Sequence, residues 1–219
     1  MDVMPMEVVL NNIGKRYRFE WIFRQIQHTF TPDKAYALLG PNGSGKSTLM
    51  KILSGHLSPS EGEIEFIQHG KRIDTDEVYR QIAYAAPYIE LIEEFSLLEG
   101  LEFHQAFKPF LDDLRPIDLI DILQFASSKN KEIRFFSSGM KQRLKLVLAI
   151  CSNTPLLLLD EPTTNLDAQG VDWYQELIDR YKRDRLLIVA SNIEQDYVFC
   201  EEQLNILNYK PVKKKRKRG

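Results

Sequence analysis

The sequence contains little cysteine and no long apolar run. Its two cysteines, Cys151 and Cys200, are too few for a disulfide framework or a cysteine metal cluster. Both lie in apolar stretches, as buried reduced thiols usually do, so we expect an intracellular protein. No apolar run approaches the roughly 18 residues that span a bilayer, and the acidic start of the chain does not resemble a secretory signal. If the protein acts at a membrane, a partner must hold it there.

The charges are unevenly distributed along the chain. The formal net charge is −2, and residues 213–219 contain six basic side chains; removing these six from −2 leaves −8 on residues 1–212. We expect residues 210–219 to form a disordered, solvated tail. The alternative is that the tail contacts anionic lipid, an acidic partner surface or nucleic acid.

Hydrophobic spacing predicts an α/β fold. Strands are predicted over residues 6–13, 35–39, 81–86, 156–160 and 186–191, with a hairpin over residues 62–73. Helices are predicted over residues 48–55, 97–107, 117–126, 140–151 and 170–182. Strands that alternate with helices indicate a parallel sheet, and without repeats or long linkers the chain reads as a single domain over residues 1–219.

The strongest motif is 40-GPNGSGKST-48, between a predicted strand and a predicted helix. It matches the phosphate-loop pattern G-x-x-x-x-G-K-[ST] in the context that this pattern requires. Glycines let the backbone N–H groups turn toward phosphate oxygens, and the helix N-terminus adds partial positive charge. The Lys46 ammonium suits the β- and γ-phosphates, and the Ser47 hydroxyl suits Mg²⁺. The predicted phosphate-binding residues are Gly40, Asn42, Gly43, Ser44, Gly45, Lys46, Ser47 and Thr48.

A second motif, 156-LLLLDEP-162, places two carboxylates at the end of an apolar strand. From the carboxyl end of a parallel strand, Asp160 can reach Mg²⁺ directly or through water. Glu161 can polarise an attacking water as a general base. The plainer interpretation is a strand followed by a turn at Pro162, but a phosphate loop in the same chain favours the catalytic one.

A third motif, 136-FSSGMKQR-143, precedes the helix predicted over residues 140–151. Serine and glycine at a helix N-terminus can bind an anion, although the motif alone is typical of an ordinary N-cap. Since the chain already has a phosphate loop, a second phosphate-binding helix end makes sense if it serves the nucleotide of another subunit.

Together these motifs resemble the ATP-binding cassette (ABC) ATPase family. The order GPNGSGKST, FSSGMKQR, LLLLDEP and 163-TTNLD-167 covers nearly the whole chain, and the last segment resembles the family's D-loop. The resemblance implies a P-loop NTPase with a RecA-like core, an antiparallel β subdomain and an inserted α-helical subdomain at about residues 88–135. It also implies ATP and Mg²⁺ as ligands.

The resemblance further implies a head-to-tail pair of cassettes, formed with a second copy or a related cassette. Each ATP would lie between the P-loop of one subunit and the signature motif of the other, which gives Ser137 and Gly139 their role. The segment 15-KRYRF-19 resembles the one whose aromatic residue stacks on adenine, so Tyr17 is the candidate. The alternative for Tyr17 is an ordinary packing or surface aromatic.

The sequence departs from the family pattern at several positions. The usual signature LSGGQ is FSSGM here, with Ser137 and Gly139 retained. Pro87 stands where the family usually has a glutamine that helps to bind Mg²⁺ and the attacking water. Asn192 stands where the family has a histidine that faces the γ-phosphate. Asparagine can donate a hydrogen bond to phosphate but cannot exchange a proton near neutral pH.

We therefore predict the ATP-hydrolysing subunit of an ABC transporter, with Glu161 and Asn192 as catalytic residues and Ser47 and Asp160 as Mg²⁺ ligands. A separately encoded transmembrane permease would hold it on the cytoplasmic face of the cell membrane, docking on residues 88–135. The alternatives are a slow or non-hydrolytic ATP switch, favoured by Pro87 and Asn192, and a soluble ABC protein of translation or DNA repair. No sequence-specific nucleic acid is expected. The substrate and the direction of transport lie outside this chain.

Overall fold

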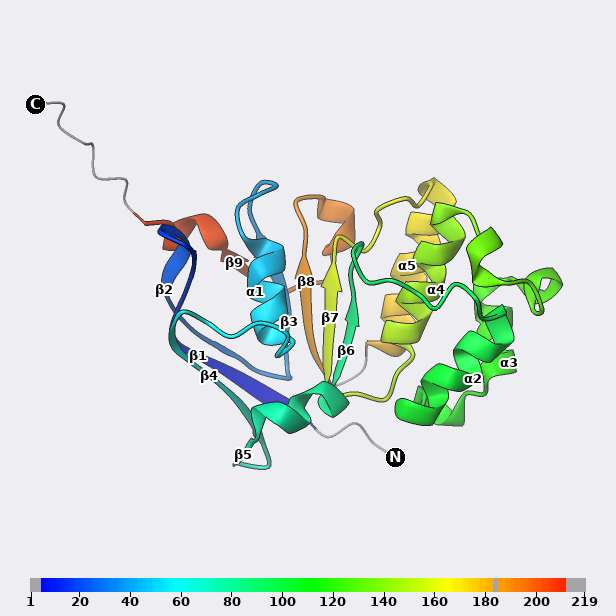
Figure 1. Ribbon diagram of the computed structural model, residues 1–219, viewed down its shortest axis with the longest axis horizontal. Coiled ribbons are helices and arrows are strands. Elements are labelled where there is room, and N and C mark those ends of the chain that lie inside the picture. The colour runs from blue at the N-terminus through cyan, green and yellow to red at the C-terminus, as the bar shows by residue number, and fades with distance from the viewer. Residues whose placement is uncertain (1–4, 183–184, 212–219) are drawn as a thin grey trace, which may run out of the picture.

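The computed structural model describes residues 5–182 and 185–211. From residue 212 on, the predicted basic tail lies outside the described residues. Figure 1 shows a layered molecule, with an antiparallel sheet at one end and the helices α2 and α3 at the other. Within the described ranges, no helix is long and apolar enough to cross a membrane.

The antiparallel sheet has the strand order β2-β1-β4-β5. Its strands are β1 (Met6–Tyr17), β2 (Glu20–Phe30), β4 (Glu61–Gln68) and β5 (Lys71–Ile73). The predicted hairpin corresponds to β4 and β5, which are joined by a turn in which His69 and Gly70 both have positive φ. Such a turn matches the twist of an antiparallel pair.

Strand β2 is absent from the sequence prediction. Its residues do not alternate strictly between buried and exposed, and Gln25 has a φ of 59°. The register of its pairing with β1 shifts between Leu10 and Ile13, so bulges break the period of two on which a strand prediction depends.

The parallel sheet has the strand order β6-β7-β8-β3-β9. Its strands are β6 (Ile82–Ala85), β7 (Leu156–Asp160), β8 (Leu186–Ala190), β3 (Ala35–Leu39) and β9 (Glu202–Asn205). The sequence pattern does not predict the edge strand β9. Strand β6 is shorter than the predicted strand over residues 81–86 because a 3₁₀ turn ends at Gln81.

Helices cover both faces of the parallel sheet. They are α1 (Lys46–Leu53), α2 (Leu97–Phe107), α3 (Pro116–Leu123), α4 (Ser138–Ile150) and α5 (Ala168–Tyr181). Leu156 and Leu158 pack into the core shared with α1 and the antiparallel sheet, whereas Leu157 and Leu159 pack against the helices of the other face. Burial on both faces explains the uninterrupted leucine run of β7 and confirms the predicted α/β class.

Candidate nucleotide-binding site

The carboxyl ends of β3, β7 and β8 meet at one edge of the parallel sheet. The Glu161 N–H donates to the Ala190 carbonyl at 2.8 Å, and the Ser191 N–H donates to the Leu38 carbonyl at 3.3 Å. The loop after β3 is the P-loop, the turn after β7 carries Glu161, and the loop after β8 carries Asn192. The sheet therefore brings three of the predicted segments together at the place where α/β sheets bind ligands.

The P-loop curls tightly into α1. Gly40, Gly43 and Gly45 have positive φ values of 148°, 75° and 109°. At Gly45 a Cβ atom would lie 2.5 Å from the Ile22 side chain, so β2 packs directly on the loop. Asn42 and Gly43 are exposed at the tip, and Ser47 and Thr48 are half-buried in the first turn of α1.

Lys46 is 4% exposed and its ammonium folds back over the loop. Its Nζ donates to the carbonyl of Gly40 at 2.7 Å and lies 3.5 Å from that of Pro41. The Ser44 hydroxyl is buried and has no hydrogen-bond partner among the described residues. A buried hydroxyl and a buried cation in a glycine-rich loop at the start of a helix suit a phosphate group.

Asp160 is the last residue of β7 and is 1% exposed. Burial raises the pKa of its carboxyl and the neighbouring Glu161 raises it further, whereas hydrogen bonding from Ser47 and Tyr88 and the charge of Lys46 lower it. Within the described residues, Oδ1 of Asp160 is a buried acceptor with no partner. An orphaned carboxylate oxygen beside the Ser47 hydroxyl fits a hard divalent cation.

Glu161 is half-buried and has a φ of 47°, a left-handed conformation that is unusual outside glycine. Its N–H is held by β8 and its carbonyl accepts from the Thr164 N–H at 3.2 Å. Strained backbone of this kind is often found at functional sites, where the surrounding structure maintains it.

Asn192 is exposed in the loop after β8, and a buried network fixes that loop. The Asp196 carboxylate, 0% exposed, accepts from the Ser191 hydroxyl and from the Thr163 hydroxyl, each at 2.5 Å. Thr163 follows the Glu161 turn, so Asp196 joins the two loops. Sequence reasoning missed Asp196, since an acidic residue in a loop is usually solvated.

Tyr17 ends β1 and its side chain is 50% exposed, with the Lys15 ammonium 5.6 Å from its ring centroid. Strand β2 connects this β1–β2 hairpin to the P-loop through the contact of Ile22 with Gly45. The hairpin therefore lies beside the P-loop, with the half-exposed Tyr17 ring at the end of β1.

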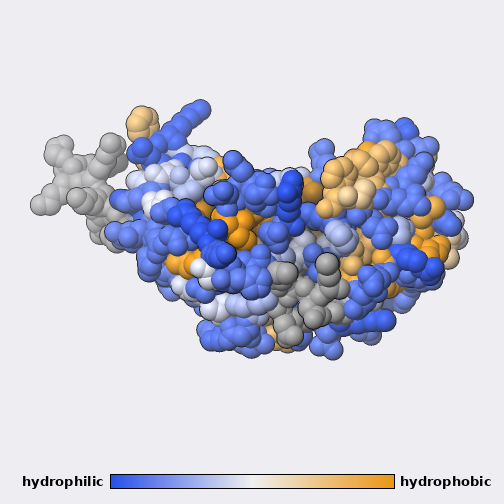
Figure 2. All heavy atoms as spheres, turned by 90° about the horizontal axis from the view of Figure 1, so that it is seen from below, coloured by the Kyte–Doolittle hydropathy of each residue, from blue (hydrophilic) through white to orange (hydrophobic). Residues whose placement is uncertain are grey.

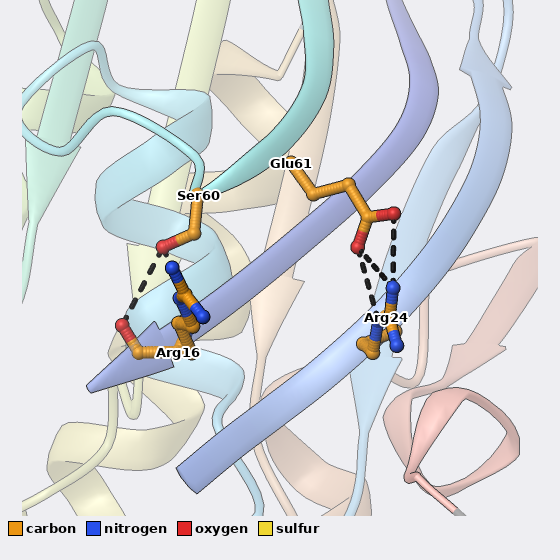
Figure 3. Close-up of polar contacts among 4 residues, drawn as sticks. All are labelled: Arg16, Arg24, Ser60 and Glu61. Atoms are coloured by element: carbon orange, nitrogen blue, oxygen red, sulfur yellow. Dashed lines mark hydrogen bonds and ion pairs between the residues drawn. The ribbon is translucent and has the colours of Figure 1, made fainter. Parts of the chain in front are cut away.

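Polar contacts anchor the same hairpin to the start of β4. The Arg24 guanidinium forms a bidentate pair with Glu61, with distances of 2.7–3.0 Å, and Ser60 exchanges hydrogen bonds with the backbone of Arg16 (Figure 3). The pair crosses β1 at Gly14, where a Cβ atom would meet the Trp21 ring at 3.0 Å and Glu61 at 3.3 Å. These contacts hold both strands of the hairpin against the start of β4.

Ser137 and Gly139 do not join the P-loop of their own chain. Helix α4 packs on the face of the parallel sheet opposite α1 (Figure 1). Ser137 caps α4 by accepting from the Met140 N–H at 3.2 Å, and an added Cβ at Gly139 would lie 3.1 Å from the Asn165 carbonyl. The motif lines a cleft of about 390 Å³ together with Asn165 and Asp167.

The chain is similar in sequence to ATP-binding proteins of ABC transporters. The ABC transporter family model matches residues 23–164. The lantibiotic transport ATP-binding protein SrtF of Streptococcus pyogenes is 31% identical over 188 residues, which cover 84% of this chain and 78% of SrtF. The uncharacterised ABC transporter ATP-binding protein YybJ of Bacillus subtilis (strain 168) is 29% identical over 198 residues, covering 89% of this chain and 90% of YybJ.

Solved structures share the fold. A putative ABC transporter ATP-binding protein from Pyrococcus furiosus has a TM-score of 0.77 at 22% identity, covering 94% of this chain and all of that one. The dimeric cassette MJ0796, in a post-hydrolysis state with ADP and phosphate, has a TM-score of 0.75 at 22% identity and covers 90% of this chain and 93% of that one. These likenesses confirm the predicted P-loop NTPase fold. Because the family model spans well over half of the sequence, the chain belongs to the ABC transporter family, as one of its ATP-binding and ATP-hydrolysing cassettes.

Proposed function

We propose that the chain is the motor subunit of a transporter whose permease is a separate polypeptide. ATP binding draws two cassettes together, hydrolysis separates them, and the permease converts this cycle into transport. The subunit would work on the cytoplasmic face of the membrane, held there by its permease. The meeting of the P-loop, the Asp160–Glu161 turn and the Asn192 loop at one sheet edge carries the proposal.

ATP is the substrate of the proposed reaction. The P-loop amides from Gly40 to Thr48 would surround its phosphates, and Lys46 would exchange its contacts with the loop carbonyls for phosphate oxygens. Tyr17 would stack on the adenine. Its half-exposed ring on a hairpin anchored beside Gly45 supports this role.

Mg²⁺ is the ion proposed for the carboxylate end of the site. Asp160, through its buried oxygen that lacks a partner, and Ser47 would hold it, directly or through water. When bound, the ion would neutralise charge on the β- and γ-phosphates.

Glu161 is the proposed general base. It would accept a proton from the water that attacks the γ-phosphorus; the bond to the bridging β–γ oxygen breaks, giving ADP and inorganic phosphate. Asn192 would donate a hydrogen bond from its carboxamide to a γ-phosphate oxygen without exchanging a proton. The network around Asp196 supports this pairing because it joins the loops of both residues.

A second copy or a related cassette would complete the site. Ser137 and Gly139 would bind the γ-phosphate on the partner's P-loop, using the N-terminus of α4. The exposed serines of this helix end, far from the chain's own P-loop, support the arrangement.

The permease would dock on the helical part of the chain, which we place at residues 88–135. An apolar groove of about 230 Å³ lies between β6, α2 and α4, with Ile89, Phe95 and Leu148 among its lining residues. Phe103 also lines the groove and is 45% exposed, and the neighbouring Phe107 ring is 72% exposed. Figure 2 shows apolar side chains at the surface of the half of the molecule that holds the helices. Exposed aromatics of this kind mark interaction surfaces.

No sequence-specific nucleic acid is required by this proposal.

The test of the site is Glu161→Gln. We expect the variant to bind ATP with the affinity of the wild type but to release phosphate at least about 100-fold more slowly, because the general base is lost. Steady-state phosphate release with Mg²⁺, beside nucleotide binding by calorimetry, measures both quantities.

Glu194→Gln is the matched control, since Glu194 is an exposed carboxylate in the loop that carries Asn192. It should hydrolyse ATP like the wild type. Equal phosphate release by Glu161→Gln and the wild type would refute the general-base assignment and favour a regulatory ATP switch.

A further inference from the structure

A tyrosine in the loop after β6 contacts Asp160, the proposed Mg²⁺ ligand. By the resemblance, Pro87 stands where the family usually has a glutamine, and proline offers neither an N–H nor a polar side chain. The next residue, Tyr88, places its hydroxyl 3.4 Å from Oδ2 of Asp160. Strands β6 and β7 pair from Ile82–Leu156 to Ala85–Leu159, so this loop begins level with the end of β7.

A second tyrosine stands behind the first. The hydroxyls of Tyr84, in β6, and Tyr88 are hydrogen-bonded to each other, and their rings meet edge to face with centroids 6.2 Å apart. A phenol has a single hydrogen to donate. Because Tyr88 donates this hydrogen to Oδ2 of Asp160, its hydroxyl oxygen must accept from Tyr84. The two hydroxyls therefore form a directed chain that ends on Asp160, and each bond in such a chain polarises the next.

The Tyr88 ring is held from the P-loop side as well. The Lys51 ammonium of α1 lies 4.2 Å from the ring centroid, a distance at which a cation is attracted to an aromatic face. The side chain is nevertheless 43% exposed, so its ring contributes little to the core. A half-exposed phenol that points at a buried carboxylate, rather than at water, is better explained by the site than by folding.

We propose that Tyr88, oriented by Tyr84, is a positioning residue that occupies Oδ2 of Asp160 and leaves Oδ1 directed at Mg²⁺. The inference rests on the proposed function of Asp160 as a metal ligand. It assigns to a tyrosine pair part of the work that the glutamine does elsewhere in the family. Outer hydrogen bonds of this kind orient a metal's carboxylate ligands, and their loss typically weakens metal binding about 10- to 100-fold.

The test measures metal binding without turnover. The free Mn²⁺ signal in electron paramagnetic resonance, followed during titration of protein saturated with ADP, gives the Mn²⁺ affinity of the nucleotide complex. We expect Tyr88→Phe to weaken this affinity about 10-fold. ADP affinity in the presence of EDTA should be unchanged, because the phenylalanine ring keeps the contact with Lys51.

Two further variants sharpen the test. Tyr84→Phe should weaken Mn²⁺ binding less than Tyr88→Phe, and the double variant should be no weaker than Tyr88→Phe alone, as expected for residues that act in series. Tyr79→Phe is the control, since Tyr79 is 56% exposed and its hydroxyl accepts from Arg80. It should bind Mn²⁺ like the wild type.

Mn²⁺ affinity within two-fold of the wild type in Tyr88→Phe would overturn the inference while leaving the proposed ATPase site intact. An equal loss of metal-free ADP affinity would also overturn it, because the ring would then serve packing alone. If the wild type itself showed no metal-dependent nucleotide binding, the proposed function and this inference would fail together.

Discussion

At the scale of single residues, the site depends on buried polar groups that are either fully paired or left open. Asp196 is paired through both carboxylate oxygens, whereas Oδ1 of Asp160 has no partner among the described residues. The paired Asp196 carboxylate holds its two loops in place. The unpaired Oδ1 of Asp160 suits a ligand, because a buried polar group without a partner is costly.

Asp196→Ala should destabilise the folded protein. It leaves the hydroxyls of Thr163 and Ser191 buried without their acceptor, at a cost of roughly 1–3 kcal/mol for each unsatisfied group. We expect the free energy of unfolding to fall by about 3 kcal/mol and ATP turnover to fall more than ATP affinity. Urea denaturation and steady-state kinetics measure these effects. Glu194→Ala, an exposed neighbour, should match the wild type, and an equally stable Asp196→Ala would exclude the proposed loop anchor.

At the scale of elements, α2 is bound to the end of α4 through a half-buried histidine. His104 Nε2 lies 2.8 Å from the Ser152 hydroxyl, which itself donates to the Leu148 carbonyl at 2.5 Å. The Ser152 oxygen must therefore accept from Nε2–H, and the His104 ring stacks on Phe110 at 5.5 Å. Burial, together with the smaller effect of the nearby Lys108 charge, lowers the pKa of His104 to about 4.

This lowered pKa predicts an acid-sensitive helix contact. Above the ordinary histidine pKa of 6.5 both states are neutral at this position, and the stability is complete. Between pH 6.5 and about 4 the unfolded chain binds the proton and the folded chain does not, so stability falls as the pH falls. The loss reaches up to about 3 kcal/mol.

The free energy of unfolding of the wild type should therefore drop more steeply over this pH range than that of His104→Gln, which keeps a donor but cannot titrate. Urea denaturation at several pH values compares the two. Because all carboxylates titrate equally in both proteins, parallel curves would show that His104 does not carry the effect.

At the scale of the whole molecule, two apolar cores lie on the two faces of the parallel sheet. The core shared with the antiparallel sheet supports the P-loop, and the core under α4 and α5 supports the signature motif. A chain built this way presents its phosphate loop and its signature helix on opposite sides, so that one copy alone has half of each proposed site.

Dimerisation should therefore depend on the signature helix and ATP binding by the monomer should not. We expect Glu161→Gln with Mg·ATP to sediment as a dimer, because hydrolysis cannot separate the pair. Adding Ser138→Asp should abolish the dimer while monomer ATP affinity stays unchanged. An acidic residue in the first turn stabilises its own helix but repels the partner's phosphates.

Ser127→Asp, at another exposed serine of the helical part, provides the matched control and should dimerise like Glu161→Gln alone. Analytical ultracentrifugation distinguishes the species. A dimer that tolerates Ser138→Asp would exclude the proposed role of the α4 N-terminus.

The sequence by itself determined the features that depend on local chemistry. Glycine spacing predicts the P-loop, and the leucine run predicts a buried parallel strand. The carboxylates at the end of that run make Asp160 and Glu161 site candidates. Periodicity also predicts most helices and strands. It does not predict β2, because bulges break the alternation of buried and exposed residues in this strand.

Only the tertiary structure decided which distant groups meet. Strand order, set by how the two cores pack, brought the loops after β3, β6, β7 and β8 to one edge and carried the signature helix to the other face. Nothing local in the sequence marks Tyr88 as a partner of Asp160, 72 positions away, or Asp196 as a link between two loops. Contacts of this kind depend on the pairing of neighbouring parallel strands, whose order a local pattern does not encode.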